Sequence, residues 1–406
     1  MARNVTIQRV TTTINDDSSN GAFDAGGVFT PTADNAVADI DRVEQFLNAG
    51  ASVDIRTHDA TNTGTQDGDI TVVGDISPGT DNIRTLRLNA NDDIVFNPGA
   101  SITQNPGSLG KLNIVLNADS DDSGLGRIHL DGYDYINAVY NLVTLSTNGG
   151  DILLGGRDAT LTGAVGTAAT YATAAASGGD QAVGVLVDFA TLDSGGGNIA
   201  LSGRAVTSGS GGYLRGVIVE LGSDVNADGG NVTINGLGGP GLSDNYGVAI
   251  GGGATNKVRT IATGSITIAG TGGSGDQGVN DGVLIGFSEV SAFNGAITIT
   301  GIAGSALNSA PSAGVRLSNT TDIVSTGSGA ISITGTGANG GDGIAANSFA
   351  ANFNPGNTIR IGQGSSGPYT GNISLTSLAG TGIALGGLGD VVVSTCLLYT
   401  SPSPRD

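Results

Sequence analysis

One short phrase returns along the second half of the chain: a glycine, a small or polar residue, an apolar–polar–apolar triplet, a variable residue and usually a second glycine. Alternation of apolar and polar residues predicts a strand with one buried face, and the flanking glycines predict turns. The phrases begin 33, 34, 31 and 34 residues apart, which indicates a repeat architecture. They occupy residues 197–203, 230–236, 264–270, 295–301 and 329–335.

Each period carries two further apolar segments. The second segment follows a glycine, at Gly216, Gly247, Gly282, Gly314 and Gly343. A weaker third segment follows around Val225, residues 258–261, Val290 and residues 323–324. Three short strands per period, with glycine at the corners and no helical pattern, predict one coil of a three-sided parallel β-helix. An antiparallel sandwich would require hairpin turns of fixed length, which the sequence lacks.

We therefore expect an all-β fold, a right-handed three-sided parallel β-helix with a short N-terminal capping helix. A single coil cannot bury enough apolar surface to fold alone, so equivalent apolar residues of successive coils are expected to stack inward in one ladder. The expected ladder consists of Ile199, Val232, Ile266, Ile297 and Ile331.

The chain divides by pattern into a cap and two kinds of coil. Residues 1–52 are expected to form the cap, with a helix at about residues 36–49 that Asp34 or Asn35 can cap at its start and Gly50 at its end. Residues 53–156 are expected to form short coils. Residues 157–395 are expected to form longer coils that continue the same solenoid.

Residues 396–406 break the alternation and resemble the translation of a sequencing-library adapter, so we interpret them as an artefact. Deleting them is expected to leave stability unchanged, and the last natural coil is expected to favour end-to-end self-association through unpaired strand edges. No secretory leader pattern follows Met1, and we expect the natural start to lie upstream.

The composition restricts the partners. The net charge is −20, with 33 aspartates, three glutamates and two lysines, so the charge lies mainly in turns. No basic stripe is present to neutralise phosphates, which argues against nucleic acid and anionic membranes as partners. No run of 18 apolar residues occurs, so no membrane-spanning segment is expected.

Several phrases resemble the large repetitive exoproteins of bacteria, of the filamentous-haemagglutinin-like and autotransporter-like kind. These are residues 85–90, 91–97, 113–121 and 149–156, together with the expected helix end at residues 46–50 and the strand at 53–55. The resemblance covers most of residues 36–395. It implies a β-helix stalk, secretion to the cell surface or the extracellular space, and a structural or adhesive role with an unknown protein or glycan receptor.

A carbohydrate-active β-helix enzyme, such as a polysaccharide lyase or hydrolase, is the alternative. Such a site needs carboxylates, alone or with Arg or Lys, that project from neighbouring coils of one face. The acidic clusters at residues 16–17, 92–93 and 119–122 fall in expected turns, and His58 and His129 are far apart in sequence. Thr298 and Thr300 form an isolated pair, so an ice-binding array is not expected either. The sequence favours a non-catalytic protein, with no catalytic residue assigned.

Calcium is the cofactor for which the sequence offers a candidate site. Asp119, Asp121 and Ser123 place oxygen ligands at alternate positions before Gly124, which matches the first half of a calcium loop. The twelfth position of that loop is Leu130, which cannot supply the usual carboxylate. A solvated turn is the alternative interpretation.

Overall fold

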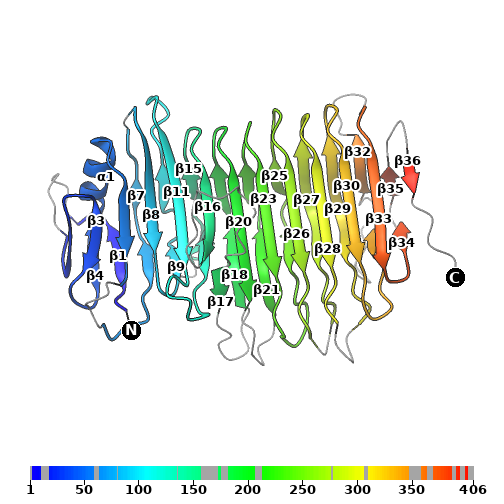
Figure 1. The fold of residues 1–406 in the computed structure, drawn as a ribbon, viewed down its shortest axis with the longest axis horizontal. Helices are drawn as coiled ribbons and strands as arrows, with labels where there is room; N and C mark the ends of the chain where they lie inside the picture. Colours follow the sequence, from blue (N-terminus) through cyan, green and yellow to red (C-terminus); the bar gives the residue numbers. More distant parts are fainter. Residues whose placement is uncertain are drawn as a thin grey trace. The chain divides into compact units, whose positions relative to one another are not determined.

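The structure of the chain is a computed structural model in which two compact units are recognised. Unit 1 comprises residues 1–175 and 184–202, and unit 2 comprises residues 176–183 and 203–406. The structure describes residues 2–10, 18–58, 64–79, 81–134, 136–156, 172–174, 182–205, 213–275, 278–305, 310–346, 358–363, 369–385, 390–393 and 398–400. These residues form parallel strands almost throughout, with one helix (Figure 1), so the predicted all-β parallel β-helix is confirmed.

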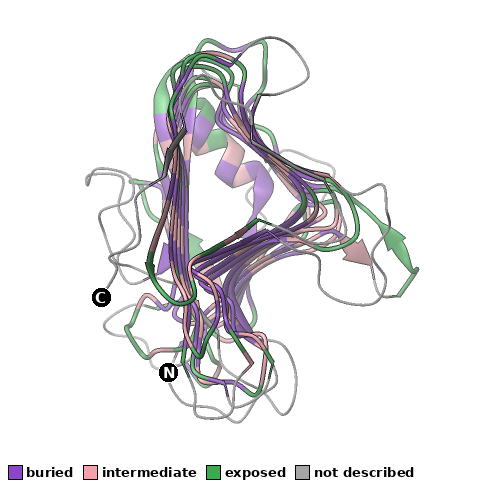
Figure 2. Cartoon of the chain, turned by 90° about the vertical axis from the view of Figure 1, so that its right-hand side faces the viewer, coloured by how far each residue is buried: buried purple, intermediate pink, exposed green. Residues whose placement is uncertain are grey.

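The coils of each unit have three sides, which Figure 2 shows in a view along the coil axis. We call them faces 1, 2 and 3 in the order in which the chain visits them after a glycine phrase. Neighbouring coils contribute one strand to each face and pair in parallel. The predicted three strands per period are thus present.

In unit 2 every face is built from successive coils. Face 1 contains β23 (Val232–Leu237), β26 (Ile266–Thr271), β28 (Ile297–Ile302), β30 (Ile331–Thr336), β33 (Ile373–Ala379) and β36 (Leu398–Thr400). Face 2 contains β21 (Leu214–Glu220), β24 (Val248–Gly251), the first halves of β27 (Val283–Ala292) and β29 (Val315–Ser325), β31 (Ile344–Ala346) and β34 (Ile383–Leu385). Face 3 contains β22 (Asp224–Asn226), β25 (Asn256–Arg259), the second halves of β27 and β29, β32 (Thr358–Gln363) and β35 (Asp390–Val393).

In unit 1 the same order holds, with additions at the amino-terminal end. Face 1 contains β2 (Gly21–Phe23), β3 (Val28–Pro31), β5 (Val53–Arg56), β8 (Ile83–Asn89), β11 (Lys111–Ala118), β16 (Ile152–Gly156) and the start of β20 (Ile199–Ala205). Face 2 contains β4 (Ala36–Asp39), β1 (Val5–Gln8), β6 (Ile70–Val72), β9 (Ile94–Phe96), β12 (Ile128–Asp131) and β18 (Ala182–Asp188). Face 3 contains β7 (Asp75–Ile76), β10 (Ser101–Thr103), β15 (Val143–Ser146) and β19 (Ala190–Asp193), and β17 covers Ala172–Ala174.

The expected inward ladder is present in unit 2. Val232 aligns with Ile266, Ile266 with Ile297, and Ile297 with Ile331. All four side chains are fully buried. In unit 1, Ile199 is also buried and aligns with Ile152. Stacked apolar side chains of this kind supply the burial that no coil can achieve alone.

The single helix among the described residues starts later than the sequence pattern suggested. α1 spans Ile40–Asn48, and its N-cap is Asp39, whose side chain accepts a hydrogen bond from the Asp41 backbone N–H. The preceding residues form β4, because they pair in parallel with β1. The expected start at residue 36 and the expected caps at Asp34 or Asn35 were therefore wrong. The expected end was right: Gly50 follows the helix with φ +85°, which favours glycine.

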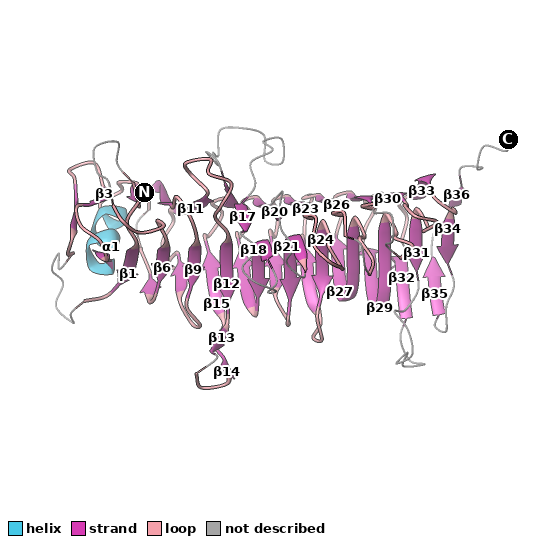
Figure 3. Ribbon diagram, turned by 90° about the horizontal axis from the view of Figure 1, so that it is seen from below, coloured by secondary structure: helices cyan, strands magenta, loops and turns pink. Residues whose placement is uncertain are grey.

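Two hairpins interrupt the solenoid pattern of unit 1, and the sequence did not reveal them. β2 pairs antiparallel with β3, and β13 (Tyr133–Asp134) pairs antiparallel with β14 (Val139–Tyr140). Figure 3 shows the second hairpin projecting away from the coils. The ring of Tyr140 packs between those of Tyr133 and Phe189, with centroid distances of 4.9 and 5.0 Å.

Two outward rows on face 1 of unit 2 correct the expectation of an isolated threonine pair. Thr298 aligns with Thr267 on one side and Ser332 on the other, and Thr300 aligns with Ala269 and Thr334. Parallel register thus collects residues that lie about 30 positions apart in the sequence. The result is a flat, uncharged hydroxyl-bearing face.

The end of the described chain also differs from the sequence interpretation. Residues Leu398–Thr400 form β36, which pairs in parallel with Ile373–Leu375 of β33. The segment 396–406 was expected to contain nothing that continues the strand pattern, and for these three residues that expectation was wrong. An unpaired strand edge accepts a further short strand with little regard to its origin, since the pairing uses backbone groups.

Candidate functional site

A row of polar side chains crosses face 1 of unit 1. Arg56 at the end of β5 aligns with Asn89 on β8, and Asn89 aligns with Asn117 on β11. Adjacent residues of a strand point to opposite sides of the sheet. The residue before each member of this row points into the buried core, namely Ile55, Leu88 and Leu116, so the row itself points to the outer side of the sheet. The Asn117 side-chain amide donates to Asn89 Oδ1 at 2.5 Å, which joins two coils.

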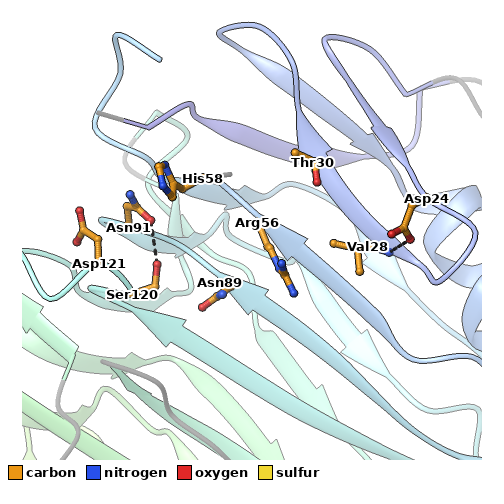
Figure 4. Close-up of a pocket in the computed structure, with 9 residues that line it drawn as sticks. All are labelled: Asp24, Val28, Thr30, Arg56, His58, Asn89, Asn91, Ser120 and Asp121. Atoms are coloured by element: carbon orange, nitrogen blue, oxygen red, sulfur yellow. Dashed lines mark hydrogen bonds between the residues drawn. The ribbon is translucent and has the colours of Figure 1, made fainter. Parts of the chain in front are cut away.

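A cavity of about 520 Å³ opens along this row. Its lining comes from four successive strands of face 1 and the turns that follow them, as Figure 4 shows. We call it the polar groove. It is lined by Asp24, Val28, Thr30, Arg56, His58, Asn89, Asn91, Ser120 and Asp121.

Hydrogen bonds fix the groove walls. Ser120 Oγ donates to Asn91 Oδ1 at 2.9 Å, and the Asn91 backbone N–H donates to Thr57 Oγ1 at 2.9 Å. Arg56 donates from Nε and Nη2 to Asp54 Oδ2, at 2.8 and 2.6 Å, so its guanidinium is held in one orientation. A site whose side chains are already oriented loses less entropy when it binds a ligand.

The predicted calcium residues form a tight turn beside the groove. Asp119 is fully buried and has φ +52°, and its Oδ1 accepts hydrogen bonds from the Gly124 N–H at 2.9 Å and from Ser123 Oγ at 3.2 Å. Asp121 Oδ1 accepts from the Ser123 N–H at 3.2 Å. Within the described ranges, no group of three or more His, Cys, Asp or Glu side chains is placed to hold a metal ion. Calcium binding at Asp119, Asp121 and Ser123 stays a prediction.

A cluster of carboxylates lies in the turn that directly precedes β9 in unit 1. Burial, followed by the neighbouring charges of Asp93 and Asp69, raises the pKa of Asp92 to about 7. Burial also raises the pKa of Asp69. Arg127 donates from Nε to Asp93 Oδ2 at 2.8 Å, so the cluster spans three coils. The sequence placed residues 92–93 in a turn, which the structure confirms; residues 16–17 lie outside the described residues.

The two histidines lie on different faces of unit 1. His58 follows β5 on face 1 and lines the polar groove. His129 lies on β12 of face 2, where burial, followed by the charge of Arg127, lowers its pKa to about 3. His129 is therefore neutral at physiological pH.

Sequence reasoning missed the polar groove as a site. It considered His58 and Asp121 separately, 63 positions apart, and the parallel register brings both to one cavity. The available signal was the polar residue at the end of each short strand phrase, namely Arg56, Asn89 and Asn117.

No known protein-family model matches this chain, and no curated protein sequence matches it. None of the described helices is long and apolar enough to cross a membrane.

Proposed function

We propose that this chain is a non-catalytic adhesive segment of a secreted or cell-surface repeat protein, and that the polar groove of unit 1 binds a glycan chain. The observation that carries the proposal is the row of outward polar side chains that crosses successive strands of face 1. Successive strands lie about 4.8 Å apart, so an extended ligand meets Arg56 and Asn89 on neighbouring strands and Ser120 and Asp121 at the next coil, where Asn117 itself is buried.

The chemistry of the lining suits sugar hydroxyl groups. Asn89 and Asn91 each carry both a donor and an acceptor, Ser120 carries a hydroxyl, and Arg56 offers several donors. Drug-like ligands favour mostly apolar pockets with few polar groups, whereas Val28 is the one apolar residue among the nine that line the polar groove. A ligand with many hydroxyl groups therefore fits it best.

The carboxylates in the groove support binding without turnover. Cleavage of a glycosidic bond commonly uses two carboxyl groups that flank the bond. Asp24 Oδ1 accepts the N–H groups of Gly26 and Val28, at 2.8 and 2.9 Å, and Asp121 accepts the N–H of Ser123. Both carboxylates thus stabilise their own turns.

The stalk part of the proposal is supported by the regular parallel pairing of unit 2. The extracellular or bacterial cell-surface location is supported by the sequence resemblance to large repetitive exoproteins and by the high acidic charge.

A binding assay tests the groove. Oligosaccharides that bind to the immobilised chain are identified on a glycan array and their affinities are measured by calorimetry. We expect Arg56→Ala with Asn91→Ala to weaken binding at least about tenfold, as loss of several hydrogen bonds predicts. The matched control is Arg87→Ala, on β8 but outside the groove lining. Unchanged affinity in the double variant, or release of reducing ends from a bound glycan, would contradict the proposal.

A second candidate, a carbohydrate-active enzyme, is favoured by one observation. Asp92 has a pKa near neutrality and lies beside Asp69, Asp93 and Arg127 on neighbouring coils, which is suited to general acid–base chemistry. Reducing-end and unsaturated-product assays on acidic and neutral polysaccharides test it. Cleavage that Asp92→Asn abolishes would establish the enzyme and replace the adhesive assignment.

A further inference from the structure

A second cavity, of about 400 Å³, lies on face 2 of unit 2. We call it the Tyr246 cavity. Its lining combines an apolar floor with charged side chains at both ends, and it comes from three successive coils. The lining residues are Arg215, Ile218, Glu220, Asp244, Tyr246, Ala249, Gly251, Gly252 and Leu284.

The floor is a row of apolar side chains in register. Ile218 on β21 aligns with Ala249 on β24, and Ala249 aligns with Leu284 on β27. These residues occupy the outward positions of face 2, yet Ile218 and Ala249 are buried. Since strands are about 4.8 Å apart, the floor is wide enough for one ring-sized ligand.

One end of the cavity holds a stacked cation. The guanidinium of Arg215 lies 5.0 Å from the ring centroid of Tyr213 and 5.2 Å from that of Tyr246. Its Nε donates to the Asp244 carbonyl oxygen at 3.2 Å. Within the described part of the chain, Arg215 forms no salt bridge with a carboxylate. A stacked arginine with free N–H groups is well suited to a planar carboxylate.

Tyr246 supplies a neutral donor at the same end. It is 7% exposed, and its hydroxyl forms no hydrogen bond with another described residue. Burial raises the pKa of this tyrosine, and the charges of Asp244 and Asp281 raise it further. The hydroxyl therefore keeps its proton at physiological pH and can donate to a ligand.

The opposite end of the cavity presents a carboxylate. Glu220 lies five residues after Arg215 on the same strand, which separates their backbones by roughly 17 Å. Gly252, with φ +101°, lies next to it; a Cβ there would meet Glu220 Oε2 at 2.8 Å. This glycine keeps the Glu220 side chain accessible from the cavity, and the separation limits repulsion between Glu220 and an anion at Arg215.

A buried ion pair on the neighbouring coils supports the Arg215 end. Arg316 donates from Nε to Asp281 Oδ2 at 2.6 Å and from Nη2 to Asp281 Oδ1 at 3.0 Å. Asp281 occupies the repeat position equivalent to Tyr246, directly before the glycine of face 2. Arg316 neutralises Asp281, so this buried carboxylate does not oppose an anion beside Tyr246. The Asp244 carboxylate, which also lines the cavity, accepts the Val279 N–H through Oδ1 at 3.3 Å.

Buried asparagines hold the backbone of this region in place. Asn245 Oδ1 accepts the N–H of Leu214 at 2.9 Å, and Asn245 Nδ2 donates to Asn280 Oδ1 at 2.9 Å. These bonds link the coils that carry Arg215, Tyr246 and Asp281.

We propose that the Tyr246 cavity binds a carboxylated sugar, a hexuronic acid either free or as a unit of an acidic polysaccharide. The carboxylate pairs with Arg215, the apolar face of the sugar ring lies on Ile218, Ala249 and Leu284, and a ring hydroxyl group bonds to Tyr246. Glu220, at the opposite end, faces the next unit of a polysaccharide. This site is separate from the polar groove and does not depend on it.

Calorimetry and ligand-observed NMR on the full chain test the proposal, with glucuronate and galacturonate as probes and glucose and galactose as neutral counterparts. We expect each uronate to bind at least about tenfold more tightly than its neutral counterpart. Arg215→Gln should remove this preference, and Ala249→Phe should abolish binding because the new ring fills the floor. Arg360→Gln, which removes an exposed salt bridge to Asp322 in the same unit, should leave binding unchanged.

The outcomes distinguish the free monosaccharide from the polysaccharide as ligand, and the Tyr246 cavity from the polar groove as the binding site. If an acidic polysaccharide binds and the free uronate does not, the ligand is the polymer. If the free uronate binds and the polysaccharide does not, the ligand is the monosaccharide. Binding that survives in the Arg56→Ala, Asn91→Ala variant belongs to the Tyr246 cavity. Equal affinity for uronate and neutral sugar, uronate affinity unchanged by both Arg215→Gln and Ala249→Phe, or no binding of any probe would overturn the proposal. Thermal unfolding of each variant checks that it is folded.

Discussion

Units 1 and 2 share one coil plan but use it differently. In unit 2 the strands β26, β28 and β30 of face 1 pair in one register, and they present threonine and serine outward. In unit 1 a helix and two hairpins are added to the coils among the described residues, and face 1 presents Arg56 and Asn89, while Asn117 of the same row is buried. The regular unit gains stability from apolar residues stacked in one register, and the irregular unit gains a varied row of polar side chains.

This difference shows which positions of a β-helix can carry side chains for binding. A position inside the coil is tied to the coils above and below, so it tolerates little change. Outward positions and turns are freer, and in both units the cavities lie there. Both units nevertheless bury charged groups: Arg84 in unit 1, which donates to Gln104 Oε1 at 2.6 Å, and the Asp281–Arg316 pair in unit 2.

The largest effect is expected for a charge placed inside the ladder of unit 2. Ile297→Asp puts a carboxylate between Ile266 and Ile331, where no partner exists to offset its desolvation. We expect unit 2 to lose protection over several coils and its thermal midpoint to fall by more than about 10 °C. Hydrogen exchange followed by mass spectrometry measures both units at once.

The control for this variant is Thr298→Asp, one residue along and on the outward side of β28. It should change stability by less than about 0.5 kcal/mol. A similar loss of stability in the two variants would show that the inward and outward sides of face 1 do not differ as described.

The next effect concerns two of the ion pairs of unit 2, one buried and one exposed. Arg316→Met leaves Asp281 buried without its partner, which typically costs about 3–5 kcal/mol. Arg360→Met removes the exposed pair with Asp322 and should cost no more than about 1 kcal/mol. Chemical denaturation of both variants gives the comparison, and equal costs would contradict the burial of the first pair.

A smaller effect is expected on the thermal midpoint of unit 1, which should depend on pH. Asp92 has a folded-state pKa of about 7 against an ordinary value of 3.8, so the folded state holds a proton that the unfolded state releases. Its contribution to stability is complete below about pH 4 and is lost as the pH rises to about 7. We expect the midpoint of unit 1 to fall by a few degrees over this range.

Asp92→Asn should flatten that pH dependence, because the amide does not titrate. Asp81→Asn is the control: Asp81 is exposed, and its Oδ1 accepts from the Leu109 N–H, which an asparagine can also do. If wild type and Asp92→Asn show the same dependence on pH, the carboxylate cluster is not the cause.

The smallest effect is expected from calcium. Asp119 and Asp121 already accept hydrogen bonds within their turn, so millimolar calcium should raise the midpoint of unit 1 by no more than about 2 °C. A larger increase that disappears in Asp119→Asn with Asp121→Asn would establish the calcium loop. Magnesium at the same concentration is the control for ionic strength.

The sequence predicted the parts of the fold that repeat. The ladder through Ile266, Ile297 and Ile331 was predictable because each isoleucine sits in the same glycine phrase. The helix start was not, because Ala36–Asp39 has an apolar pattern that suits either a strand or a helix, and pairing with β1 decides it.

The sites were harder to predict than the coils. Arg56, Asn89 and Asn117 are separated by 33 and 28 residues, so unequal coil lengths hide their alignment. The position of Tyr246 was easier to see, since Arg215, Tyr246, Asp281 and Asp342 each directly precede a glycine that begins a face 2 segment. Which of them border a cavity depends on packing, which no local pattern encodes.

The common register of face 1 in unit 2 also bears on how such a chain can change over generations. From β23 to β30 each coil pairs with its neighbours in one register, so the removal or duplication of one whole coil there preserves the register and the inward ladder at the new junction. The glycine phrases offer similar stretches for recombination. Natural variants of this region are therefore expected to differ in length by whole coils, whereas a single-residue deletion within a strand would turn inward side chains to the outside.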